Sequence, residues 1–179
     1  MEVPRRVVNE GYICQLHVFC DASMRTYGAL AYIVVADQPF MLTCKVRVAP
    51  LKSRTIPQLE LTGTKLAKYV RDTLDHLTIT ETCLWTDSEI TLQWVKNNSC
   101  KIPYVQNRVA EIYDLQEGCK FIYVDTKSNP ADLLSRGVTV KQLNNNVIWF
   151  NGPEWLPNHE QWPEQKDNVA TINYTDTQD

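Results

Sequence analysis

With 179 residues, 44 % of them hydrophobic and 22 % charged, the chain has the size of one domain with an appendage or of two small domains. No apolar run approaches membrane-spanning length, and six cysteines without a C-x-x-C pair beside three scattered histidines argue against a zinc site. The net charge of −3 hides an asymmetry, because residues 151–179 carry −5 and the remainder therefore carries +2. A mildly basic body permits contact with nucleic acid without requiring it.

The first part of the chain predicts an antiparallel meander of three strands. Residues 1–11 lack periodicity and are expected to form an extended lead-in. A period-2 pattern predicts a strand that ends near Cys20, and two further strands are expected at 29–35 and 41–48, joined by a turn at 37–39.

Asp21 follows the first of these strands directly. An unpaired charge at the buried end of a strand is costly, so this carboxylate is expected to cap the next turn, to be paired, or to bind a cation.

A helix is expected to begin at Thr55, because Thr55 and Gln58 fit a capping box and Pro57 lies in the first turn. Positions spaced by three and four residues up to residue 74 share one face, which is apolar except for Glu60. A glutamate on a packed face either reaches out to the rim or has a function.

A second acidic strand end follows this helix. Residues 82–86 predict a short strand that ends at Asp87, and a helix is expected at 88–95. A strand after a crossover helix normally lies parallel to an earlier one, so Asp21 and Asp87 should meet at the edge where open α/β sheets bind ligands.

The remaining elements are a helix at 104–115, a strand at 121–124 and a compact helix capped by Asn129, with Asp132 at its third position. Favourable interaction with the helix dipole is sufficient to explain Asp132 by itself. We expect the Trp-rich segment 138–163 to pack on the domain without regular structure.

These elements predict four segments. They are an extended lead-in at 1–11, one domain at 12–137, the extension at 138–163, and an acidic, disordered tail at 164–179.

Four acids in this topology, without a histidine or cysteine cluster, favour hard divalent cations and Mg²⁺ in particular where phosphate oxygens complete the shell. Two such ions about 4 Å apart promote attack on a phosphodiester and stabilise its leaving oxygen.

The chain resembles the ribonuclease H family and, more narrowly, the ribonuclease H domain of LTR retrotransposon polyproteins of the BEL/Pao type. The resemblance covers about residues 3–163 and rests on the motifs FCDAS…YGA, RVAPLKSRTIPQLEL, LWTDSEITLQWV, VQNRVAEI, NPADLLSRG and VIWFNGPEWL. It implies an α/β ribonuclease H-like fold, a five-stranded mixed sheet with helices on both faces, followed by an irregular Trp-rich C-terminal segment.

The resemblance also implies a site and an activity. Asp21, Glu60, Asp87 and Asp132 would be the catalytic metal ligands, with Asp21 shared between two Mg²⁺ ions for which Mn²⁺ can substitute. The enzyme would hydrolyse the RNA strand of RNA–DNA hybrids during reverse transcription, as one part of a polyprotein with reverse transcriptase upstream and integrase downstream. We therefore expect an intracellular, cytoplasmic location, including virus-like particles, and no membrane partner.

Seven polar or basic residues are further candidates for contact with nucleic acid. Lys45 and Arg47 share one face of a predicted strand, although a solvated edge strand explains them equally well. The candidates are Ser23, Lys45, Arg47, Lys52, Arg54, Ser88 and Asn107.

Two departures from the family bear on catalysis. The histidine that cellular and retroviral members carry before the last helix is missing from residues 125–128, and residues 96–103 hold only two lysines. We expect no role for histidine in the chemistry, and weak catalysis by the isolated domain is plausible. A non-catalytic ribonuclease H-like module that positions nucleic acid or a partner protein is the alternative. An integrase or resolvase of the same fold is a third reading, disfavoured by the C-terminal motifs.

Overall fold

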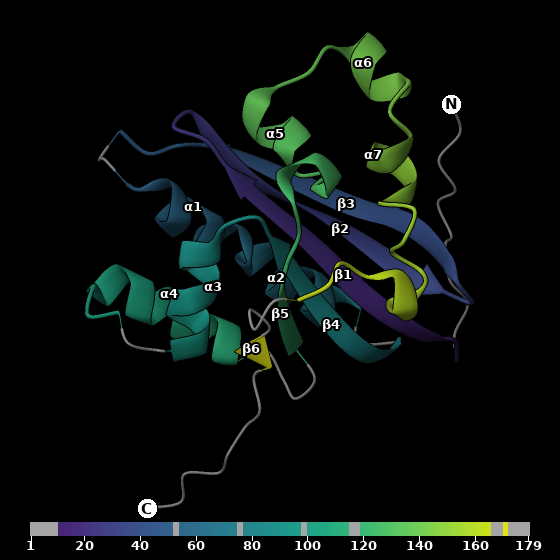
Figure 1. Cartoon of the computed structure of the whole chain (residues 1–179), viewed down its shortest axis with the longest axis horizontal. Coiled ribbons are helices and arrows are strands. Elements are labelled where there is room, and N and C mark those ends of the chain that lie inside the picture. The colour runs from purple at the N-terminus through teal and green to yellow at the C-terminus, as the bar shows by residue number, and fades with distance from the viewer. Residues whose placement is uncertain are drawn as a thin grey trace, which may run out of the picture.

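The computed structural model describes residues 11–51, 54–74, 77–97, 100–114, 119–165 and 170–171 (Figure 1). Its strands are β1 Ile13–Ala22, β2 Thr26–Val35, β3 Gln38–Val48, β4 Thr78–Thr86, β5 Cys119–Tyr123 and β6 Ala170–Thr171. Its helices are α1 Ile56–Gly63, α2 Lys65–Thr73, α3 Glu89–Asn97, α4 Pro103–Tyr113, α5 Asp132–Arg136, α6 Val140–Asn144 and α7 Val147–Asn151, with 3-10 turns η1 Thr126–Ser128 and η2 His159–Gln161. Among the helices described here, none has the length and apolar character needed to span a membrane.

The strands form one mixed sheet in the order β3-β2-β1-β4-β5-β6. β1, β2 and β3 are antiparallel neighbours, whereas β4 lies parallel to β1 and β5 lies parallel to β4. The predicted five-stranded mixed sheet is confirmed, with the two-residue β6 added antiparallel to β5. The parallel pairing brings the carboxyl ends of β1 and β4 to the same edge of the sheet.

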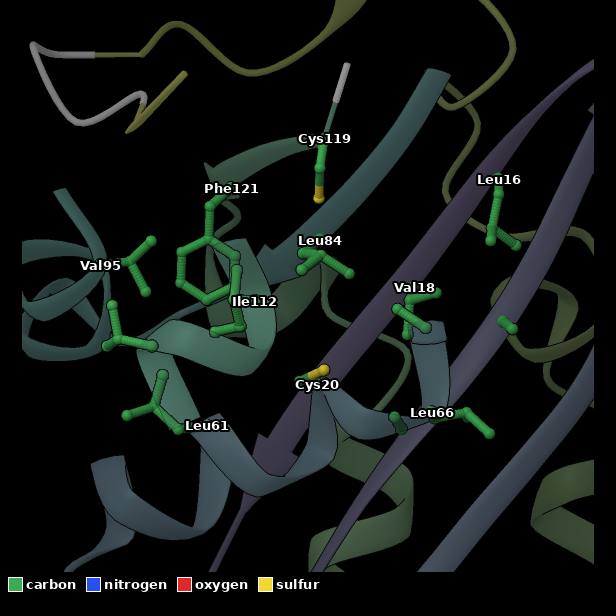
Figure 2. Close-up of a cluster of buried hydrophobic side chains, with 14 of the residues drawn as sticks. Leu16, Val18, Cys20, Leu61, Leu66, Leu84, Val95, Ile112, Cys119 and Phe121 are labelled. Atoms are coloured by element: carbon green, nitrogen blue, oxygen red, sulfur yellow. The ribbon is translucent and has the colours of Figure 1, made fainter. Parts of the chain in front are cut away.

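Helices cover both faces of the sheet, as predicted. On one face, β1 alternates Leu16, Val18 and Cys20 into a core that α1–α4 complete (Figure 2). On the other face, α5, α7 and the following segment pack over an aromatic core around Phe19 and Trp85. In Figure 1, α5, α6 and α7 lie together, away from α1, α3 and α4.

Two local predictions in the first half of the chain are wrong. The turn between β2 and β3 is formed by Ala36 and Asp37, both with positive φ, and Gln38 already pairs with Val35. The helix expected up to residue 74 is divided at Thr64, whose hydroxyl donates to the Leu61 carbonyl at 2.6 Å. A side chain that bonds to the preceding turn competes with the helical ladder and favours a break.

The C-terminal segment is more regular than expected. It contains α6, α7 and η2, each begun by a side-chain cap, which five-residue helices need because few of their backbone groups are paired internally. Part of the tail expected to be disordered is also ordered, since the Gln165 side chain bonds to both backbone groups of Tyr123 and β6 pairs with β5. The lead-in at 1–10 and the rest of the tail lie outside the described residues.

Candidate metal centre

Three of the four predicted acids converge at the shared edge of β1 and β4. Asp21 is the second-last residue of β1, Glu60 lies on α1, and Asp87 directly follows β4. Each offers a carboxylate oxygen, and these three oxygens all lie within 4.8 Å of one another. In α1 the capping-box glutamine accepts from the Thr55 amide at 3.2 Å, which fixes where the helix begins and so which residue faces the sheet.

Asp132 lies in the same cleft but outside this group of three. The cleft has a volume of about 630 Å³ and is lined by all four acids together with residues of α1, α5 and the β1–β2 turn. Asp132 is the first residue of α5 and not the third, because the Asn129 side chain accepts from the Ala131 amide at 3.1 Å and Pro130 forms a turn before the helix. Its Oδ1 accepts from Arg136 Nε at 2.7 Å.

A hydroxyl group holds each of the three converging carboxylates. Ser135 donates to Asp21 Oδ2, Thr91 donates to Glu60 Oε2 at 2.8 Å, and Thr126 donates to Asp87 Oδ2 at 2.7 Å. Neutral donors of this kind orient a carboxylate without neutralising it. These three hydrogen bonds therefore bring no positive charge that would compete with a cation.

Burial and mutual repulsion raise the proton affinity of two of these acids. Asp21 and Glu60 are 6 % and 4 % exposed. Loss of solvent raises the pKa of Asp21 to about 6, with a smaller contribution from the charges of Asp87 and Asp132. Loss of solvent likewise raises the pKa of Glu60 to about 7, again with Asp87 and Asp21 adding to the effect. Such a cluster is complementary to a positive ion.

The donor set fits a hard divalent cation. Carboxylate oxygens are the ligands that Mg²⁺ and Mn²⁺ prefer, and the nearby Cys20 is no competitor because burial raises the pKa of its thiol well above the usual range. Asp21, Glu60 and Asp87 would hold such an ion, and Asp132 lines the same cleft.

The histidines do not contribute to this centre. His17 is fully buried and accepts a hydrogen bond from Trp85 Nε1 at 3.2 Å. Burial lowers the pKa of His17 to about 3, so its ring is neutral. The His159 ring packs against Trp162 at 4.3 Å between centroids, and His76 lies outside the described residues.

The predicted nucleic-acid contacts are dispersed. Ser23 and Ser88 line the carboxylate cleft, but both also hold the backbone, since Ser23 Oγ donates to the Ser135 carbonyl at 2.9 Å and Ser88 Oγ accepts from the Thr91 amide at 3.2 Å. The Arg54 guanidinium lies 3.5 Å from the centre of the Tyr104 ring. Asn107 is exposed on α4 and does not line this cleft.

The basic pair on β3 belongs elsewhere. Lys45 and Arg47 line a second cleft, and Lys52 lies outside the described residues.

Sequence reasoning missed the partners of the carboxylates. Arg136 follows Asp132 at a spacing of four, which places the two on one side of a helix, so the signal for this pair was present in the NPADLLSRG motif. Ser135 is 114 residues from its partner Asp21, and Thr91 is 31 residues from its partner Glu60. Thr126 is 39 residues from Asp87, and no local pattern connects the two.

Comparison with known proteins finds one family model that matches the first part of the chain. Residues 1–88 match the model of the family described as Pao retrotransposon-like RNaseH-like domain. Over this range the chain is similar to that family. The matched range includes Asp21, Glu60 and Asp87, the three acids that converge. No curated protein matches the chain.

Solved structures confirm the ribonuclease H-like fold. The N-terminal RNase H domain of a Mycobacterium tuberculosis protein is 15 % identical, with a TM-score of 0.53 over 70 % of this chain and 92 % of that one. RNase H1 from Halobacterium salinarum is 13 % identical, with a TM-score of 0.52 over 69 % and 95 %. LC11-RNase H1, isolated from compost, is 17 % identical, with a TM-score of 0.52 over 73 % and 99 %. At these identities the likeness shows the fold alone.

Proposed function

We propose that this chain is a two-metal-ion endonuclease that hydrolyses the RNA strand of RNA–DNA hybrids during reverse transcription of a retrotransposon. The convergence of Asp21, Glu60 and Asp87 within 4.8 Å, in a cleft that also contains Asp132, carries the proposal. The fold supports it, because the similar LC11-RNase H1 was solved in complex with an RNA/DNA hybrid.

The chemistry divides between the ions and the chain. Divalent ions supply Lewis acidity and neutralise charge at a phosphodiester. The protein's part is to hold four carboxylates in one cleft and to orient three of them through Ser135, Thr91 and Thr126. Such fixed positions limit the reorganisation needed as the reaction proceeds.

The wider setting is part of the same proposal. The domain would work within a polyprotein, between a reverse transcriptase upstream and an integrase downstream, in the cytoplasm or in virus-like particles. Mg²⁺ would be the ion in the cell, and Mn²⁺ would support activity in its place.

Incubation of the protein with labelled RNA–DNA hybrid, DNA duplex and RNA duplex, each in Mg²⁺, in Mn²⁺ and in EDTA, tests the proposal. We expect metal-dependent cleavage of the RNA strand of the hybrid alone. Asp21→Asn or Asp87→Asn should reduce the rate by at least about a hundredfold, in the range found when charge-stabilising groups are removed from active sites. Asp72→Asn, which removes an exposed acid of α2, is the matched control and should cleave normally.

The alternative reading is an outcome of the same experiment. Hybrid binding without cleavage in either metal would indicate a non-catalytic module, and cleavage of DNA duplex would indicate another nuclease of this fold. Full activity in Asp21→Asn would remove this carboxylate cluster from the mechanism.

A further inference from the structure

A second cleft lies at the C-terminal end of α1, whereas the carboxylate cleft is lined by residues nearer the start of that helix. The second cleft has a volume of about 360 Å³ and is bounded by β2, the edge strand β3, and helices α1 and α2. Its charged and aromatic lining residues are Tyr27, Lys45, Arg47, Lys65 and Tyr69. We call this cleft the basic groove.

The basic groove is cationic. Lys45 and Arg47 are two residues apart on β3 and so project from the same face of the sheet, toward α2. In the part of the chain that the structure describes, neither forms an ion pair with a carboxylate and no acid lines the groove. Lys65 forms an ion pair with Glu111 at 3.5 Å, and the Lys45 ammonium lies 5.4 Å from the centre of the Tyr69 ring. Two unpaired cations beside tyrosine rings suit an anionic group.

Strand pairing places the groove level with the carboxylate centre. Across β1, β2 and β3, one row of paired residues consists of Cys20, Ala29 and Lys45. A second row, two residues further along β1, consists of Ala22, Tyr27 and Arg47. On β3, two strands away from Asp21, Lys45 and Arg47 therefore lie on either side of the residue in the row of Asp21. Adjacent strands are about 4.8 Å apart, so the backbones at Asp21 and at the groove are separated by roughly 10 Å.

That separation matches the spacing of phosphates on a nucleic-acid strand. The phosphates of one strand rise by about 3.4 Å along the duplex axis, but they also wind around it and are farther apart than this through space, so roughly 10 Å spans about one or two nucleotides. A duplex whose scissile phosphate lies at the carboxylates would present another backbone phosphate at this distance.

We propose that the basic groove binds a backbone phosphate of the RNA–DNA hybrid about one or two nucleotides from the bond to be cut. This inference rests on the proposed function for the substrate class. It adds a subsite in which Arg47 and Lys45 neutralise one phosphate and thereby set the register of the hybrid on the carboxylates.

The first test measures hybrid binding as a function of salt. All proteins carry Asp87→Asn to prevent cleavage, and binding is followed by fluorescence anisotropy in Mg²⁺ between low and moderate KCl. Adding Arg47→Gln or Lys45→Gln should weaken binding by roughly three- to tenfold and reduce the slope of log affinity against log salt by about one. Lys141→Gln, which removes one exposed cation from α6 on the other face, should leave the slope unchanged. If Lys141→Gln weakened binding and reduced the slope equally, the effect of the groove residues would reflect general surface charge, and the proposal would be overturned.

The second test locates the phosphate. We would prepare a series of hybrids, each with one neutral methylphosphonate at a different position on either strand. Their affinities for Arg47→Gln and for its parent, compared with those of the unmodified hybrid, give a double-mutant cycle at each position. We expect coupling at one position about one or two nucleotides from the cleavage site and none elsewhere. Absence of coupling at every position would refute the subsite even if the enzyme cleaves hybrid.

An acidic protein segment is the competing occupant. If a polyglutamate peptide bound the groove in an Arg47-dependent manner while Arg47→Gln left hybrid binding unchanged, the groove would serve a protein partner and the proposal would fail. These binding measurements do not depend on turnover, so their failure is distinguishable from failure of the proposed nuclease activity.

Discussion

At the scale of single residues, the carboxylate centre destabilises the metal-free protein. Asp21 and Glu60 have pKa values of about 6 and about 7, both raised by burial. The folded state therefore binds protons more tightly than the unfolded chain, whose carboxyl groups titrate near pH 4. The stability that these groups contribute is fully present below about pH 4 and is lost as the pH rises through 6 and 7.

This leads to a prediction for thermal unfolding in EDTA. The melting temperature should fall between pH 5 and pH 8 in the parent, and Asp21→Asn should reduce that fall. At about 1.4 kcal/mol for each tenfold change in proton affinity, the effect is a few kcal/mol, or several degrees for a chain of this size. Differential scanning fluorimetry of parent, Asp21→Asn and Asp72→Asn measures it, and parallel curves for all three would contradict the assigned pKa values.

Arg136 is the second residue whose role can be tested. It forms an exposed ion pair with Asp132, the fourth acid of the cleft, and exposed pairs of this kind contribute little to stability. A cation can therefore displace it at small cost. Arg136→Gln should tighten binding of the weaker Mn²⁺ ion by up to about fivefold, as measured by calorimetry.

Lys127→Gln is the control, because it removes a nearby exposed cation that has no bond to Asp132. The comparison separates direct competition between Arg136 and the metal ion for Asp132 from a general electrostatic effect. Equal Mn²⁺ affinities in Arg136→Gln and the parent would show that the ion pair does not compete with metal.

At the scale of elements, the position of Glu60 depends on how closely α1 approaches the sheet. A Cβ added at Gly63 would lie 3.1 Å from the Gly28 carbonyl oxygen and 3.3 Å from Cys20. A strand carbonyl cannot yield easily, so the close contact should outweigh the gain of about 1 kcal/mol that alanine offers over glycine within a helix.

We therefore expect Gly63→Ala to destabilise the protein by about 1–2 kcal/mol and to weaken Mn²⁺ binding by shifting α1. Urea unfolding and calorimetry measure the two effects. Thr73→Ala, at the exposed end of α2, is the control, and a Gly63→Ala protein more stable than its parent would show that the helix has room to move.

Elements also show what could be predicted from the sequence. Asp21 and Asp87 were predictable neighbours because each ends a buried strand and the crossover makes those strands parallel. Glu60 was predictable from the helical period and the capping box. The hydroxyl partners were not, because Thr126 reaches Asp87 only through the tertiary fold. The short helices α6 and α7 escaped prediction because five residues are too few to show a period.

At the scale of the whole molecule, the C-terminal segment completes one face of the core. Leu156 is fully buried, the Tyr32 hydroxyl donates to the Trp149 carbonyl at 2.8 Å, and the Trp155 and Trp162 rings lie 4.9 and 5.0 Å from Trp85. The boundary at residue 137 remains a prediction, but these contacts make residues 138–163 part of what stabilises the fold.

Leu156→Ala should accordingly destabilise the chain by about 2–5 kcal/mol, the usual cost of truncating a fully buried leucine. Val147→Ala, at a position 69 % exposed, should cost less than about 0.5 kcal/mol. Urea unfolding compares the two, and equal midpoints would show that the segment packs too loosely to matter.

Strand β3 has one further consequence, because it forms an open edge of the sheet. Its last five residues are exposed, and Val46 and Val48 alternate there with Lys45 and Arg47. An exposed apolar edge invites another chain to add a strand, and cationic side chains are a common protection against it. The residues that we assign to phosphate binding therefore also keep neighbouring molecules apart. A sheet that lost them would gain a self-associating edge, so the same two side chains serve solubility as well as recognition.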